Sequence, residues 1–172
     1  GVKVHLAFNV LIFEPELEIA AEVLKEILPL GPDAFIVQDL GLVQLIRQMA
    51  PHVRIHGSTQ MTVTNDEAIR LVDDLNIQRF VLGRENSLEE IKTIRAGTTR
   101  EIEVFVHGAL CIAYSGRCLL SGYMSHRDSN QGACTNACRW DYKVKPGQQT
   151  SSGDVVLLQE AKRPGELMPM EE

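Results

Sequence analysis

The sequence lacks several features that would assign a function directly. None of its apolar stretches approaches the ~18–20 continuous residues of a membrane span, and its first ten residues lack the parts of a secretory signal. It contains no Gly-x-Gly-x-x-Gly run, no Gly-x-Ser-x-Gly elbow and no His-Glu-x-x-His motif. These absences disfavour a membrane protein, a dinucleotide-binding enzyme, a serine hydrolase and the usual zinc peptidase. We therefore expect a cytoplasmic protein with no membrane partner.

Cysteine is absent from most of the chain. All four cysteines, Cys111, Cys118, Cys134 and Cys138, fall within residues 111–138. In a reducing compartment such density indicates metal binding or redox chemistry more than structural disulfides. Only the second pair has the short spacing typical of structural zinc sites, whereas iron–sulfur clusters accept more varied spacing. The residues favour an iron–sulfur cluster, with zinc or structural cysteines as alternatives.

One region of this acidic chain has a positive charge balance. The net charge is −6, yet residues 111–145 carry five basic side chains against two acidic ones. The basic side chains of this island are Arg117, Arg127, Arg139, Lys143 and Lys145. Tyr114, Tyr123 and Trp140 lie among them, and aromatic rings with arginines can stack bases and hold phosphates. Such an island can attract phosphate or RNA. On the residues alone, a solvated loop is the favoured interpretation, and the aromatic side chains can instead pack the cysteine loop onto the sheet.

Short apolar runs alternate with amphipathic segments along the first 110 residues. The runs predict strands at 4–8, 35–37, 53–55, 80–82 and 102–106. The segments between them predict helices at 16–28 and 41–49 and helix starts at the capping-box sequences 64–67 and 87–90. This alternation is typical of a parallel sheet with helices packed against it.

Polar side chains follow each predicted strand. Because the carboxyl ends of parallel strands meet at one edge, binding and catalytic groups concentrate there. Among the residues at these exits are Asn9, Gln38, Asp39 and Ser58. The candidate catalytic residues are His56, Gln60, Arg84, Glu85 and His107. The alternative for each is an ordinary polar loop residue.

The cysteine region resembles a known family. Its two blocks are EVFVHGALCIAYSGRCLLSGY at 103–123 and RDSNQGACTNACRWDYKV at 127–144. Together they closely resemble the signature of the collagenase-like peptidases of family U-32, and in particular the branch of that family that hydroxylates tRNA. Looser agreement extends back through 82–91 and 57–65.

The resemblance implies a fold as well. It implies a partial TIM-barrel-like (β/α) domain over residues 1–145, including the cysteine motif at 103–144. Residues 146–172 are then a polar linker or tail that leads into a missing C-terminal region, with one apolar stretch at 155–158 that can form a strand. Since full barrels need about 250 residues, we expect a fragment. An open, five-stranded doubly wound sheet is the alternative, and exposed sheet edges would favour a homodimer.

The resemblance also implies a function. It implies 5-hydroxylation of the tRNA wobble uridine without molecular oxygen, with tRNA as partner and a small-molecule oxygen donor or co-substrate. Relatives carry a [4Fe–4S] cluster, for which Cys111, Cys118 and Cys134 are the matching ligands here. Cys138 is the least certain ligand, because in some relatives the fourth lies further downstream. The alternatives are a peptidase, as the family name says, and a zinc-stabilised binding module.

Overall fold

The computed structural model describes residues 1–109, 111–150 and 153–160, with only the backbone of 143–160. The chain divides into two compact units, Gly1–Cys118 and Leu119–Glu172, and each is described here by itself. No helix among the described residues is long and apolar enough to cross a membrane.

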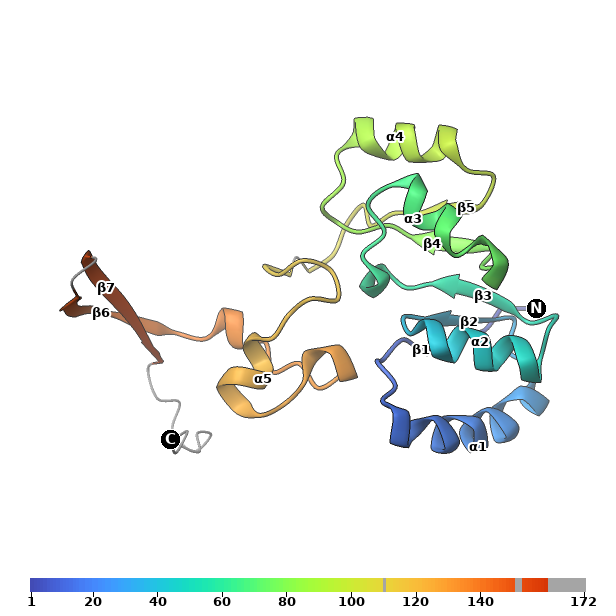
Figure 1. Cartoon of the computed structure of the whole chain (residues 1–172), viewed down its shortest axis with the longest axis horizontal. Coiled ribbons are helices and arrows are strands. Elements are labelled where there is room, and N and C mark those ends of the chain that lie inside the picture. Colours follow the sequence, from blue (N-terminus) through green and yellow to red (C-terminus); the bar gives the residue numbers. More distant parts are fainter. Residues whose placement is uncertain (110, 151–152, 161–172) are drawn as a thin grey trace. The chain divides into compact units, whose positions relative to one another are not determined.

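The first unit is built on a five-stranded parallel sheet (Figure 1). Its strands are β1 (His5–Phe8), β2 (Ala34–Val37), β3 (Arg54–Gly57), β4 (Arg79–Val81) and β5 (Glu101–Glu103). They pair in the order β1-β2-β3-β4-β5. The expected α/β class with five parallel strands is confirmed, and the sheet is open, as in the alternative to a barrel-like arrangement. The uninterrupted order is also the one that successive strands have in a (β/α)8 barrel.

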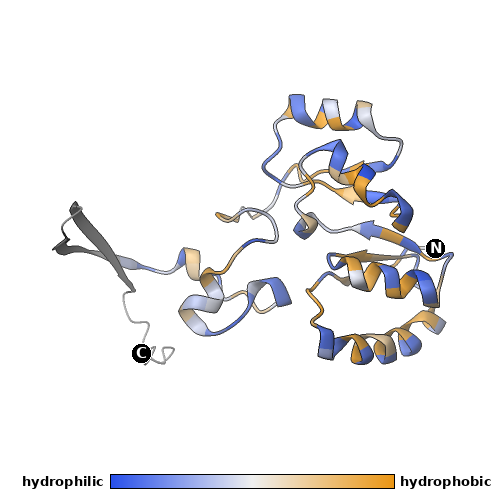
Figure 2. Ribbon diagram, viewed as in Figure 1, coloured by the Kyte–Doolittle hydropathy of each residue, from blue (hydrophilic) through white to orange (hydrophobic). Residues whose placement is uncertain are grey.

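Helices connect these strands. The α-helices are α1 (Leu17–Ile27), α2 (Leu40–Met49), α3 (Asp66–Leu71) and α4 (Leu88–Gly97). Short 3-10 turns accompany them at η1 (Glu14–Glu16), η2 (Leu28–Leu30), η3 (Thr59–Met61) and η4 (Asp73–Leu75). Hydrophobic and hydrophilic residues alternate around α1 and α2, as expected of helices with one buried side (Figure 2).

The core lies on one face of the sheet. Phe35, Val37, Ile55 and Phe80 are fully or almost fully buried there, together with apolar residues from all four helices. Because parallel crossovers are right-handed, an unbroken strand order places successive helices on the same face. We call this the helix-covered face.

The opposite, helix-free face carries polar and charged side chains. Alternation along the strands places His5, Arg54, His56, Arg79 and Glu101 on it. Arg54 Nη2 lies 3.0 Å from Glu101 Oε1, and Arg79 Nη2 lies 2.8 Å from Glu101 Oε2. A further ion pair joins Arg79 Nη1 to Glu103 Oε2 at 3.0 Å. These pairs neutralise the cations of this face.

The second unit begins with short helices. They are α5 (Leu120–Ser125) and the turns η5 (Ser129–Gln131) and η6 (Ala137–Arg139). An antiparallel hairpin follows, made of β6 (Tyr142–Thr150) and β7 (Gly153–Glu160). The apolar stretch at 155–158 lies within β7. Residues 161–172 lie outside the described part of the chain.

Candidate functional site

Ser115 is the centre of a polar anchor at the carboxyl edge of the sheet. It belongs to the cysteine loop, here residues 107–118, and is only 1% exposed. Its N–H donates to Glu85 Oε1 at 2.8 Å, and its Oγ lies 3.2 Å from both Glu85 carboxylate oxygens. Since Glu85 follows β4, this contact ties the cysteine loop to a strand exit.

Arg84 extends the same anchor. Its Nη2 donates to Ser115 Oγ at 3.1 Å and to the carbonyl of Ala113 at 3.4 Å. Its Nη1 donates to the carbonyl of Cys111 at 3.4 Å. One guanidinium therefore binds three residues of the loop. Arg84 and Glu85, two of the candidate catalytic residues, both hold the cysteine loop, and their catalytic role stays a prediction.

Residues that follow β3 also take part in the anchor. Thr62 Oγ1 donates to the carbonyl of Ser115 at 2.6 Å and accepts from Arg117 Nε at 3.2 Å. Gly116 has a left-handed φ of +68°, and a Cβ there would collide with the main-chain oxygen of Gln60. Only glycine combines this backbone conformation with so close an approach. The anchor therefore fixes the segment that connects Cys111 to Cys118.

Some buried polar atoms near the carboxyl ends of the strands have no hydrogen-bond partner. Within the described residues they are Gln38 Oε1, His56 Nε2, Gln60 Oε1 and Asn86 Oδ1. His56 is 2% exposed, and its ring meets that of His5 edge-on with centroids 4.9 Å apart. Such unsatisfied groups are rare in native proteins, and an ordered water, an ion or a ligand commonly supplies the missing partner.

His56 is neutral at physiological pH. Burial lowers its pKa from 6.5 to about 4, and the positive charge of Arg79 acts in the same direction. Smaller effects come from His5 and Arg54, while the carboxylate of Glu103 opposes them. A neutral imidazole offers one donor and one acceptor and no charge.

His107 is placed differently. The run at 102–106 predicts that β5 leads directly into it, but β5 ends at Glu103, and His107 lies in an exposed bend. Val104, Phe105 and Val106 are also exposed. The predicted strand end was therefore wrong by three residues, because no sixth strand among the described residues pairs with β5 at this edge of the sheet.

The second unit holds the other two cysteines. Cys134 Sγ accepts a hydrogen bond from the N–H of Asn136 at 3.3 Å, a contact that stabilises a thiolate and is common around cluster sulfurs. Ser121 Oγ accepts from Thr135 N–H at 2.9 Å, and Trp140 Nε1 donates to the carbonyl of Thr135 at 3.2 Å. Trp140 thus helps to hold the segment that carries Cys134.

The four cysteines form no disulfide. Cys111, Cys134 and Cys138 are exposed, and Cys118 is half-buried. The described residues contain no group of three histidine, cysteine or acidic side chains close enough to hold a metal; Cys111 and Cys118 belong to one unit, and Cys134 and Cys138 to the other. The thiol donors, and the N–H bond to Cys134 Sγ, fit an iron–sulfur cluster chemically.

The basic island is partly described. Arg117 and Arg127 are exposed, and Tyr123 exposes 66% of its surface. Arg139 is exposed at the end of η6. The side chain of Lys143 lies outside the described residues.

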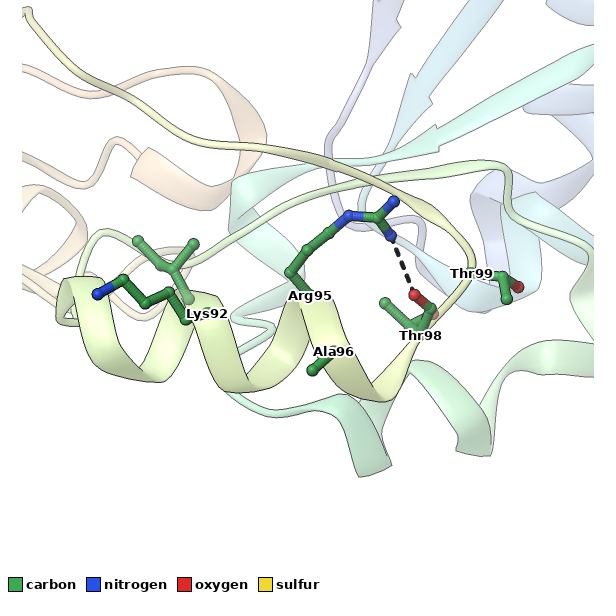
Figure 3. A pocket seen from close by; sticks show the side chains of 6 residues that line it. Lys92, Arg95, Ala96, Thr98 and Thr99 are labelled. Atoms are coloured by element: carbon green, nitrogen blue, oxygen red, sulfur yellow. Dashed lines mark hydrogen bonds between the residues drawn. The ribbon is translucent and has the colours of Figure 1, made fainter.

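A surface pocket lies elsewhere, along α4 and the turn after it (Figure 3). Lys92, Arg95, Ala96 and two threonines line it, and Arg95 Nη1 donates to the carbonyl of Thr98 at 3.0 Å. It contains none of the predicted site residues, so the anchor at the carboxyl edge remains the candidate functional site.

The family assignment follows from a match over almost the whole chain. The model of peptidase family U32 matches residues 1–167. The chain belongs to peptidase family U32. No solved structure shows significant similarity to it.

Relatives within the family carry different names. The chain is 40% identical over 194 residues to the tRNA hydroxylation protein P of Escherichia coli (strain K12), covering 98% of this chain and 43% of that protein. It is 37% identical over 148 residues to the 23S rRNA 5-hydroxycytidine C2501 synthase of the same organism, covering 86% and 22%. A collagenase of Porphyromonas gingivalis (strain ATCC BAA-308 / W83) is 31% identical over 156 residues, covering 84% and 37%. The chain spans less than half the length of each.

Proposed function

We propose that this U32 chain is part of an RNA hydroxylase that adds a hydroxyl group to C5 of the tRNA wobble uridine without molecular oxygen. The supporting observation is the 40% identity to a tRNA hydroxylation protein across almost the whole chain, together with a relative named as an rRNA 5-hydroxycytidine synthase. Both names describe hydroxylation of RNA. The oxygen then comes from a small-molecule donor or co-substrate.

Cysteines of this chain hold a [4Fe–4S] cluster in the proposal. Cys111, Cys118 and Cys134 are the proposed ligands, and Cys138 is the candidate for the fourth. When bound, such a cluster supplies one-electron redox chemistry at a potential set by its surroundings. The N–H of Asn136 supports Cys134 as a thiolate, and the anchor formed by Arg84 and Glu85 orders the loop that carries Cys111.

RNA meets the basic island in this proposal. Arg117, Arg127 and Arg139 are exposed on it, and the ring of Tyr123 is available for stacking. These residues compensate locally for the acidic balance of the whole chain.

Mass spectrometry of tRNA tests the activity. Cells that lack the gene should lose 5-hydroxylation of the wobble uridine, and the wild-type gene should restore it. Genes with Cys111→Ser or Cys134→Ser should fail to restore it. A gene with Lys92→Ser, at an exposed position outside the cysteine region, should restore it. Unchanged tRNA modification in the deletion strain would refute the proposal.

Metal analysis of anaerobically purified protein tests the cofactor. We expect iron and acid-labile sulfide in equal amounts and absorbance near 400 nm. One zinc without sulfide would instead support a zinc-stabilised binding module.

A peptidase has weaker support from the site itself. Ser115 and Ser121 are buried, and both hydroxyl groups are engaged in hydrogen bonds. Neither is therefore placed as a nucleophile. The name of the collagenase relative remains the main argument for proteolysis.

A further inference from the structure

Three side chains around the ends of β2 and β3 have buried polar atoms that the described chain leaves unsatisfied. These are Gln38 Oε1, His56 Nε2 and Gln60 Oε1. Gln38 is only 8% exposed and His56 only 2%. Burial without a partner costs stability, so three such atoms in one region indicate that another group binds them.

The three residues lie around the carboxyl ends of two neighbouring strands, β2 and β3. In the register of the sheet, His56 is opposite Ile36, and the N–H of Ser58 donates to the carbonyl of Val37 at 2.8 Å. Because Val37 belongs to the core, alternation places Gln38 and His56 on the helix-free face. Gln60 follows β3 within η3.

The cysteine loop borders this group. The main-chain oxygen of Gln60 is in direct contact with Gly116. Thr59, beside Gln60, has its Oγ1 3.4 Å from Ser115 Oγ. A ligand bound by Gln60 would therefore lie next to the anchored segment between Cys111 and Cys118.

The group carries no net charge. Its members are two amides and an imidazole that burial keeps neutral. The nearby cations, Arg54 and Arg79, are already paired with Glu101. An uncharged ligand with donors and acceptors would complement the two amides.

We propose that Gln38, His56 and Gln60 bind the edge of an unpaired pyrimidine base of RNA. Amide side chains match the alternating donors and acceptors of base edges. Enzymes that modify a base remove it from the stack and read its edge in a pocket. The proposal rests on the RNA-hydroxylase function, and it adds the residues that recognise the base.

Variants with apolar side chains of similar volume distinguish a role in base recognition from a role in stability. Gln38→Met and Gln60→Met keep the side-chain volume but remove the amide. Binding is measured with an RNA stem-loop that has uridine, adenosine or an abasic residue at one unpaired loop position. We expect each variant to lose about tenfold in the preference for uridine. Its melting temperature should be equal or higher, because an unsatisfied oxygen has gone.

Gln78→Met is the matched control. Gln78 Oε1 accepts hydrogen bonds from Ile55 N at 2.8 Å and from Arg47 Nη2 at 3.2 Å. The control should therefore lower the melting temperature and leave the uridine preference unchanged. If Gln38→Met and Gln60→Met behave like this control, the amides are structural and the proposal is wrong.

A second measurement does not depend on the reaction. Side-chain amide NMR signals of the ¹⁵N-labelled protein are followed during titration with uridine, cytidine, adenosine or inorganic phosphate. Shifts of Gln38 and Gln60 with the two pyrimidines alone support the site, even if the deletion strain keeps its tRNA modification. No shift with either pyrimidine overturns the site and leaves buried water as the partner of these atoms, even if the hydroxylase function holds.

Discussion

Glu85 connects two parts of the chain that are 30 residues apart in the sequence. Its loss should therefore also affect the cysteine loop. Its carboxylate accepts the buried N–H of Ser115 at 2.8 Å. In Glu85→Ala this N–H loses its partner, so we expect the unfolding free energy to fall by about 1–3 kcal/mol. Chemical denaturation measures the change.

Two variants make this test specific. Glu85→Gln keeps an oxygen acceptor and should lose clearly less stability than Glu85→Ala. Glu89→Ala removes a carboxylate from the exposed ion pair with Lys92 and should stay within about 0.5 kcal/mol of wild type. Equal effects of Glu85→Ala and Glu89→Ala would show that the anchor does not stabilise the loop.

His56 should make stability depend on pH. Its pKa is about 4 in the folded chain and 6.5 without burial, so between these values the unfolded chain binds a proton that the folded chain does not. Stability is fully present above pH 6.5 and falls by about 1–3 kcal/mol as the pH drops towards 4. His56→Asn should flatten this slope in denaturation curves, whereas His52→Asn, at an exposed turn, should not. A slope that persists in His56→Asn would assign it to other groups.

Sequence reasoning could select residues at the site but not their contacts. His56, Gln60, Arg84 and Glu85 were predicted because polar residues after parallel strands meet at one edge. That Arg84 and Glu85 converge on Ser115 could not be predicted, because it depends on how the cysteine loop folds back over a strand exit. Gly116 gave no signal in the sequence beyond being one of several glycines in the cysteine region.

The elements themselves were largely predictable. Each of the five apolar runs contains or overlaps a strand, because buried parallel strands need apolar side chains. Ser87 caps α4 in the predicted capping box with Glu90. At α3 the prediction was wrong by one residue, since Asn65 caps the helix by accepting from Ala68 N–H. Asparagine competes well with threonine for this position.

The turn at Gly116 is the element on which the anchor depends most. Gly116→Ala would combine a left-handed φ with a collision against Gln60. Gly31 has a similar φ of +69° but no atom within 4 Å of an added Cβ, so Gly31→Ala measures the backbone cost alone, about 1 kcal/mol. We expect Gly116→Ala to lose about 1–3 kcal/mol more than this control. Hydrogen exchange of residues 111–117 should also increase in Gly116→Ala, and equal losses in both variants would contradict close packing of the turn.

At the scale of the whole molecule, the unbroken strand order explains why the two sheet faces differ. Helices that all lie on one side leave the other face without an apolar cover, and Arg54, Arg79 and Glu101 satisfy one another there. Periodicity alone left the barrel-like and doubly wound arrangements open, because both use the same βα units. Strand order depends on how the βα units assemble into the sheet, and no single βα unit determines it.

The charge distribution of the whole molecule gives the last prediction. A chain with a net charge of −6 repels RNA on average, so binding should depend on the few exposed cations of the basic island. Arg127→Glu should weaken RNA binding severalfold and reduce the slope of log K against log salt concentration by about 1. Lys3→Glu makes the same change in net charge at an exposed position outside the island. Fluorescence titrations between about 0.05 and 0.2 M salt should therefore separate the two variants. Equal effects would mean that RNA responds to total charge and that the island is an ordinary solvated surface.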